Sequence, residues 1–207
     1  MSAAARLDAF TDAAFAFAIS LMVVGAGGGA PDYQGLVQVM RSVPSFAIGF
    51  AIMAMFWFAH VRWRLYRGEG DWRSVLLTFL LIFVVLVYVH PLRAMAQSFA
   101  AFLGGRGSQY GGHLTEMFTI YGIGFTTMAL ITCALYWDAL RRPDLAPAPR
   151  REVAGQRIIW GILTVTGLVS IAISLIRPIA QLAPFAYATL PISIGLFASR
   201  WKWEQPA

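Results

Sequence analysis

Polar and charged residues stand at the start of the first apolar segment, where a lipid-facing helix has no use for them. They are Arg6, Asp8, Thr11 and Asp12, at the head of a segment that runs on to Val24. Ionisable groups at membrane depth usually face protein or a water-filled path, where they mark routes for ions or protons. The alternative is that they lie at the membrane surface, where charge costs little, and spacing alone weighs the two interpretations equally.

Deeper in the same segment, a stripe of one hydroxyl among apolar side chains follows the period of a helix. Phe17, Ser20, Leu21 and Val24 fall at i, i+3, i+4 and i+7. Such a stripe is typical of a helix–helix seam, the commoner case, and it also suits the narrow part of a pore that gates by dewetting. Small residues of the same segment form a face that permits close packing of a neighbouring helix. They are Ala9, Ala13 and Ala16.

A histidine near the end of the second apolar segment, His60, is the other candidate for ion or proton chemistry. Imidazole titrates near neutral pH, which makes His60 a possible proton-exchange partner for Asp12. A hydrogen-bonded interfacial histidine is an equally good interpretation. His90 and His113 fall on the opposite side of the membrane, so no metal cluster with His60 is expected. No acid, base and metal ligands converge at one depth, so we predict no enzyme activity and no cofactor.

Long apolar segments carry these candidate residues. The chain of 207 residues is 58% hydrophobic and 13% charged, whereas an ordinary soluble domain is about 25% charged. One crossing of the hydrocarbon needs about 20 apolar residues. We therefore predict an all-α membrane protein with a single six-helix transmembrane domain over residues 1–207. The expected spans are about 7–24, 43–63, 74–89, 114–137, 158–176 and 179–197.

Prolines set several of the expected boundaries. The third span should end at His90 and Pro91, because proline suits a helix end. The run RRPDLAPAPRRE should be a linker before the fifth span. The sixth span contains Pro184 and Pro191, which can kink a membrane helix without ending it.

The basic residues sort to one side of this arrangement. Six spans place 12 of the 16 Lys and Arg residues on the side of the N-terminus and 4 on the other. Cytoplasmic loops carry the excess of Lys and Arg, so both termini are expected in the cytoplasm, with the protein in the cell inner membrane. The net charge of +6 lies in short loops rather than on one soluble face, so a nucleic-acid partner is not expected.

The runs RLDAFTDAAFAFAIS and FWFAH resemble the bacterial branch of the transmembrane protein 175 family of potassium channels. That family opens its first helix with an R-x-x-x-F-S-D signature and carries a Trp and a His near the end of its second helix. The matching residues here are Arg6, Phe10, Thr11, Asp12, Trp57 and His60. The six-span layout extends the resemblance over nearly the whole chain, although outside these two runs it is mostly one of hydropathy.

The resemblance implies a homotetramer in the lipid bilayer, with a central pore lined by the first helix of each subunit. It implies passive, potassium-favouring conduction of monovalent cations, with potassium as the permeant ion and no cofactor. By position, Phe17, Leu21 and Val24 would form apolar rings and Ser20 a hydroxyl ring. The signature residues and His60 would brace the helices behind the pore.

The chain departs from the family pattern at several positions. Thr11 replaces the usual Ser, and Ser20 replaces the usual Thr, so both keep the hydroxyl. Phe17 stands where an aliphatic residue is usual, and a ring of four Phe would close the pore more tightly or present its faces to a cation. The third helix lacks a family-typical Asn. These departures bear on selectivity and open probability rather than on the fold.

Two other functions stay open at this point. A proton-conducting channel would use Asp12 and His60 and would respond to a pH gradient. A non-conducting scaffold or accessory subunit would use the first-helix stripe only as a packing seam.

Overall fold

The structure is a computed structural model that describes residues 3–24, 32–68, 70–105 and 111–201. Within these residues it is all-helical, which confirms the predicted fold class and the number of helices. The elements are α1 (Ala3–Val24), α2 (Tyr33–Arg67), α3 (Trp72–Leu103), η1 (Gly111–His113), α4 (Leu114–Leu140), α5 (Pro147–Ser174), η2 (Arg177–Thr189) and α6 (Leu190–Arg200).

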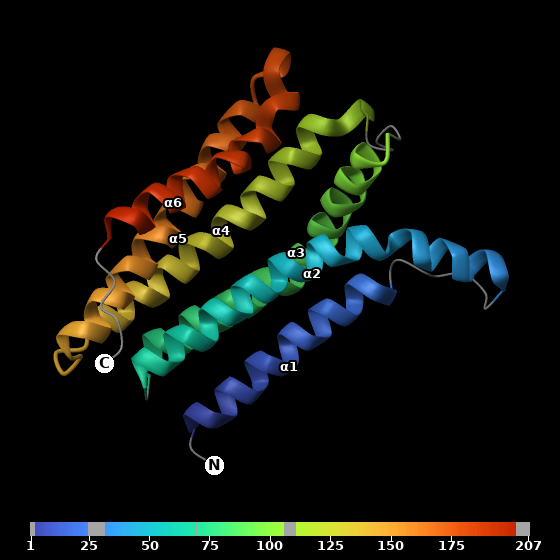
Figure 1. Ribbon diagram of the computed structural model, residues 1–207. Helices are drawn as coiled ribbons and strands as arrows, with labels where there is room; N and C mark the ends of the chain where they lie inside the picture. The colour runs from blue at the N-terminus through green and yellow to red at the C-terminus, as the bar shows by residue number, and fades with distance from the viewer. Residues whose placement is uncertain (1–2, 25–31, 69, 106–110, 202–207) are drawn as a thin grey trace.

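The helices form an elongated bundle with α1 at one edge (Figure 1). α1 packs on α2 and α3, and α3 joins this group to α4, which packs extensively on α5. η2 and α6 lie along α5, on the side of the bundle away from α1. The shared core is apolar and aromatic, with Phe56 between Phe125 of α4 and Trp160 of α5. From α1, the core receives Phe15 and Met22.

The long helices have the length and composition of membrane spans. Five candidates are found among the described residues: α2, most of α3, most of α4, α5, and the segment Pro178–Arg200. α1 is not among these five. Large apolar side chains such as Phe83, Val165 and Ile192 remain exposed on the outer surface, where lipid would cover them. The protein is therefore a multi-pass membrane protein.

The prediction that the third span ends at Pro91 is wrong for the helix, because α3 continues through Pro91 to Leu103. A proline inside a soluble helix costs about 3 kcal/mol, but neighbouring helices make it tolerable in a membrane bundle. Here the residues on both sides of Pro91 are held by packing: Val89 is 1% exposed and Leu92 is 0% exposed. Tertiary burial therefore overrides the local preference of the proline.

Only residues 141–146 of the expected linker before the fifth span lie outside a helix, and its second half is helical, because α5 begins at Pro147 rather than near residue 158. Proline fits the first turn of a helix, where its missing N–H would have no partner. α2 likewise begins at Tyr33, ten residues before its expected span, where the Asp32 carboxylate accepts a hydrogen bond of 2.7 Å from the Gly35 N–H.

The sixth span is a 3₁₀-helix followed by an α-helix rather than a kinked α-helix. η2 has 13 residues and includes Pro184, although runs of 3₁₀-helix beyond three or four residues are uncommon. The Ser170 hydroxyl of α5 donates a hydrogen bond of 2.9 Å to the Ala183 carbonyl, just before this proline. The neighbouring helix thus satisfies a buried backbone group of the irregular segment.

Ion pairs join the helix ends that carry most of the arginines. Arg67, at the end of α2, pairs with Asp138 of α4 at 2.6 Å and with Asp71 before α3 at 3.5 Å. Arg62 of α2 pairs with Glu152 in the first turns of α5. We call this the arginine-rich end of the bundle, defined by Arg62, Arg64, Arg67, Arg73, Arg141, Arg142, Arg150, Arg151 and Arg200.

The same contacts show that successive helices alternate in direction. α1, α3 and α5 start at the arginine-rich end, whereas α2 and α4 finish there. The guanidinium carbon of Arg151 in α5 lies 5.9 Å from the ring centre of Trp201, which follows α6, so α6 also finishes at this end.

Asp71 caps the start of α3. Its carboxylate accepts hydrogen bonds of 3.1 Å from the backbone N–H groups of Ser74 and Arg73. The bond from the Ser74 N–H, above all, lowers the pKa of Asp71.

Candidate ion-conduction face

α1 turns one face into the bundle. Thr11, Phe15, Ala18 and Met22 are at most 2% exposed. Their spacing of i, i+4, i+7 and i+11 is that of a single helical stripe. The Thr11 hydroxyl donates a hydrogen bond of 2.8 Å to the Leu7 carbonyl in the preceding turn, so this buried polar group needs no partner on another helix.

The opposite face of α1 is open to the outside of the bundle. Phe17 is 58% exposed, and Ser20 beside it is also exposed. Leu21 sits at the margin of this face and packs partly against the core. Val24 is the last residue of α1, and its side chain lies outside the described part of the structure. The predicted stripe therefore divides, with Phe17 and Ser20 on the open face and Leu21 at its edge.

The small residues of α1 share this open face with Ser20. Ala9, Ala13, Ala16 and Ser20 follow at i, i+4, i+7 and i+11, and all are exposed. A face of alanines allows another helix to approach closely. The Ser20 hydroxyl donates to the Ala16 carbonyl at 2.9 Å, which leaves its lone pairs available as acceptors. The face thus combines close-packing positions with one oxygen ligand.

Side chains at the arginine-rich half of α1 fasten it to α2. The Trp57 indole N–H donates a hydrogen bond of 2.8 Å to the Asp12 carboxylate. One turn closer to the end, Arg64 binds both oxygens of Asp8, at 2.6 Å and 3.4 Å. Two charge-assisted contacts four residues apart on α1 fix both its rotation and its height against α2. The open face of α1 is therefore held outward by bonds on its other side.

The remaining signature residues take different places. Phe10 packs on Phe79 of α3, with ring centres 5.6 Å apart. Arg6 is exposed near the start of α1. His60 is 2% exposed, and its Nε2 lies 3.2 Å from the Thr78 hydroxyl of α3. His60 thus links α2 to α3.

Asp12 and His60, considered together as a proton-exchange pair, bind different partners. Asp12 accepts from Trp57, whereas His60 pairs with Thr78 and lies against Trp63, with ring centres 5.1 Å apart. The structure gives this pair no shared hydrogen bond among the described residues.

Sequence reasoning missed the ion pair of Arg64 with Asp8. The signal was present, because Trp57, His60 and Arg64 follow at i, i+3 and i+7 and so share one side of α2. Asp8 stands four residues before Asp12 on α1, which puts the two carboxylates on the same side of that helix.

Replacing Trp57 with Phe should loosen α1 without changing the core, because Trp57 is 37% exposed. A partly exposed hydrogen bond to a carboxylate is worth about 1 kcal/mol. We expect the free energy of unfolding of the purified protein in detergent to fall by about that amount. In an Asp12→Ala background, Trp57→Phe should lower the free energy of unfolding by almost nothing. An equal loss with and without Asp12 would contradict the hydrogen-bond coupling of these two residues.

Residues 6–88, which include most of α1, all of α2 and the first half of α3, match the family model described as endosomal/lysosomal potassium channel TMEM175. A protein of Marivirga tractuosa named "Potassium channel" is 29% identical over 218 residues, covering 94% of this chain and 87% of that protein. The matched range holds every residue of the first-helix signature as well as Trp57 and His60.

Solved structures extend the match over the whole bundle. A variant of the potassium channel MtTMEM175, bound to a nanobody–MBP fusion protein, superposes with a TM-score of 0.82 at 27% identity, covering 94% of this chain and 91% of that chain. The TMEM175 homologue of Chamaesiphon minutus has the same fold, with a TM-score of 0.65 at 21% identity over 98% of this chain and 100% of that one. The signature contacts of α1 and α2, the family model and the superposition agree: residues 6–88 are similar to the TMEM175 family of potassium channels, and the whole bundle is similar in fold to the potassium channel MtTMEM175.

Proposed function

We propose that this chain forms a passive, potassium-favouring cation channel, a homotetramer in which four copies of α1 surround a central pore. The observation that carries the proposal is the two-sided character of α1. One side is bonded to α2 through Asp8 and Asp12, and the other leaves Phe17, Ser20 and the alanines exposed in a single chain. The potassium selectivity rests on the family and on the relatives named as potassium channels.

The proposed pore uses the stripe on α1. Phe17, Leu21 and Val24 would form apolar rings that conduct only when wetted, and Ser20 would offer a ring of hydroxyl oxygens between them. A cation entering the pore would exchange part of its hydration shell for these hydroxyl oxygens. Conduction then follows the electrochemical gradient, so no nucleotide or redox cofactor takes part.

The same proposal orients the protein in the cell inner membrane, as one transmembrane domain over residues 1–207. The arginine-rich end faces the cytoplasm, as expected for the side with most Lys and Arg. α1 also crosses the bilayer, because its 22 residues span about 33 Å at 1.5 Å per residue. That length matches a hydrocarbon core of about 30 Å.

The test is the reversal potential of purified protein in planar bilayers under opposed potassium and sodium gradients at symmetric pH. We expect reversal close to the potassium equilibrium potential. Reversal that follows an imposed pH gradient instead would assign the protein to proton conduction through Asp12 and His60. A silent bilayer, with inserted and assembled protein under every gradient, would favour a non-conducting scaffold.

A further inference from the structure

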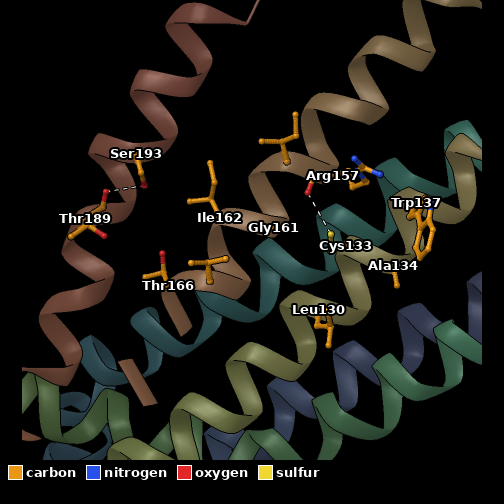
Figure 2. A pocket seen from close by; sticks show the side chains of 12 residues that line it. Leu130, Cys133, Ala134, Trp137, Arg157, Gly161, Ile162, Thr166, Thr189 and Ser193 are labelled. Atoms are coloured by element: carbon orange, nitrogen blue, oxygen red, sulfur yellow. Dashed lines mark hydrogen bonds between the residues drawn. The ribbon is translucent and has the colours of Figure 1, made fainter. Parts of the chain in front are cut away.

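A groove runs along the side of the bundle that faces away from α1. Figure 2 shows its two walls, one from α4 and α5 and the other from the end of η2 and the start of α6. Its volume is about 870 Å³, and Leu130, Gly161, Ile162 and Val165 are among its apolar lining residues. From Arg157 to Thr166 along α5 it extends over about 13 Å, close to half the thickness of a hydrocarbon core.

One end of this groove is basic and aromatic. Arg157 and Trp137 lie together there (Figure 2), whereas Thr189 and Ser193 line the opposite wall. Arg141, one turn beyond Trp137, stacks on the indole with its guanidinium carbon 4.7 Å from the ring centre. Arg157 is exposed ten residues into α5, beyond the first turns that carry the other arginines.

Among the described residues, the carboxylates near this end already have arginine partners, and none of them pairs with Arg141 or Arg157. Those pairs are Asp8–Arg64, Asp71–Arg67, Asp138–Arg67, Asp144–Arg142 and Glu152–Arg62. Arg157 therefore holds positive charge for which the described residues supply no ion pair, and Arg141, which also borders a pocket lined by Asp71, Asp138 and Asp144, makes no ion pair with them either. An arginine at the edge of an apolar membrane groove is costly unless an anion meets it.

We propose that this groove binds an anionic phospholipid of the leaflet at the arginine-rich end. The acyl chain lies along Leu130, Gly161 and Val165, and the phosphate meets Arg157 and Arg141, with Trp137 at the headgroup boundary. The match has three parts. The groove is apolar and of one-leaflet length, Arg157 lines its end without an ion pair among the described residues, and Trp137, which also lines that end, carries Arg141 on its ring. Arginine binds phosphate oxygens in a planar, two-pronged way, which favours it over lysine in this role.

Gly161 allows the acyl part of the site to be closed without disturbing the fold. A Cβ added at Gly161 meets no atom within 4 Å, so Gly161→Leu fills open groove rather than packed core. Gly195 of α6 is equally open and does not line the groove, which makes Gly195→Leu a matched control. For the phosphate part, Arg157→Gln removes the charge, and Arg6→Gln removes the same charge from α1 on the other side of the bundle.

The experiment is native mass spectrometry of the purified full chain in detergent, titrated with phosphatidylglycerol or phosphatidylcholine. We expect preferential binding of phosphatidylglycerol, which Arg157→Gln weakens about tenfold and Arg157→Lys weakens less. Binding of phosphatidylcholine should change little in either. Gly161→Leu should abolish binding of both lipids at this site, whereas Gly195→Leu and Arg6→Gln should match the unaltered chain.

Two results would overturn the proposal. One is an equal effect of Arg157→Gln and Arg6→Gln, or of Gly161→Leu and Gly195→Leu, on phosphatidylglycerol binding. The other is a change in the number of chains per complex on Gly161→Leu alone, which would make the groove an interface between subunits.

Discussion

Replacing Phe17 with Ala should raise the resting cation current about tenfold. In the proposed tetramer, four Phe17 side chains form the bulkiest apolar ring, and a ring of that kind holds the pore dry. Truncation to alanine widens the ring and lowers the free-energy barrier to wetting. A tenfold rise corresponds to about 1.4 kcal/mol at the barrier. The measurement is single-channel or macroscopic current in planar bilayers at matched protein density.

Leu168→Ala supplies the matched control for this experiment. Leu168 is 54% exposed, close to Phe17 at 58%, but it lies on α5 and does not line the groove. Its truncation should leave the current unchanged. If Phe17→Ala also conducts like the unaltered protein, Phe17 does not line the conducting path.

Replacing Asp138 with Ala should lower the free energy of unfolding by about 3 kcal/mol. Asp138 and Arg67 form a pair in which both side chains are largely buried, at 7% and 13% exposure. The Ser74 hydroxyl also donates to Asp138, at 2.7 Å, so one carboxylate joins α2, α3 and α4. Removing Asp138 takes the 2.6 Å partner away from a largely buried guanidinium, whose contact with Asp71 is longer, at 3.5 Å. Breaking a buried pair in this way costs more than the pair itself contributes.

Asp144→Ala tests whether burial of the ion pair explains the large loss of stability expected for Asp138→Ala. Asp144 pairs with Arg142 at the same end of the bundle, but its side chain is 63% exposed, and exposed ion pairs contribute little to stability. Thermal unfolding of the two purified variants in the same detergent should separate them clearly. Equal losses would show that the buried network does not stabilise the bundle in this way.

Hydropathy and charge were enough to predict the number of helices, because each span repeats the same requirement for apolar length. They could not locate helix ends outside the apolar segments. α5 starts at Pro147, because proline suits the first turn of a helix. α3 passes through Pro91 because burial of the residues on both sides overrides the local preference of that proline. The 3₁₀ form of η2 depends on a hydroxyl of another helix, Ser170, which no local pattern reveals.

The candidate site was predictable in its residues and less so in its contacts. The signature marked Asp12 and Trp57, and the structure joins them by a hydrogen bond. Helical period placed Phe17 and Ser20 on one stripe, but could not say that α1 would lie at the edge of the bundle with that stripe outward. Which face is open depends on which side chains bond to α2, and that is a tertiary property. The pore roles of these residues stay predictions.

The central claim, that the open face of α1 lines the ion path, is tested most directly by accessibility at Ser20. The chain has one cysteine, Cys133, so Ser20→Cys in a Cys133→Ala background offers a single reactive thiol. A positively charged methanethiosulfonate reagent should block the current of Ser20→Cys and spare Leu168→Cys on α5 in the same background. A current from Ser20→Cys that persists after complete modification of the thiol would contradict the assignment of this face to the pore.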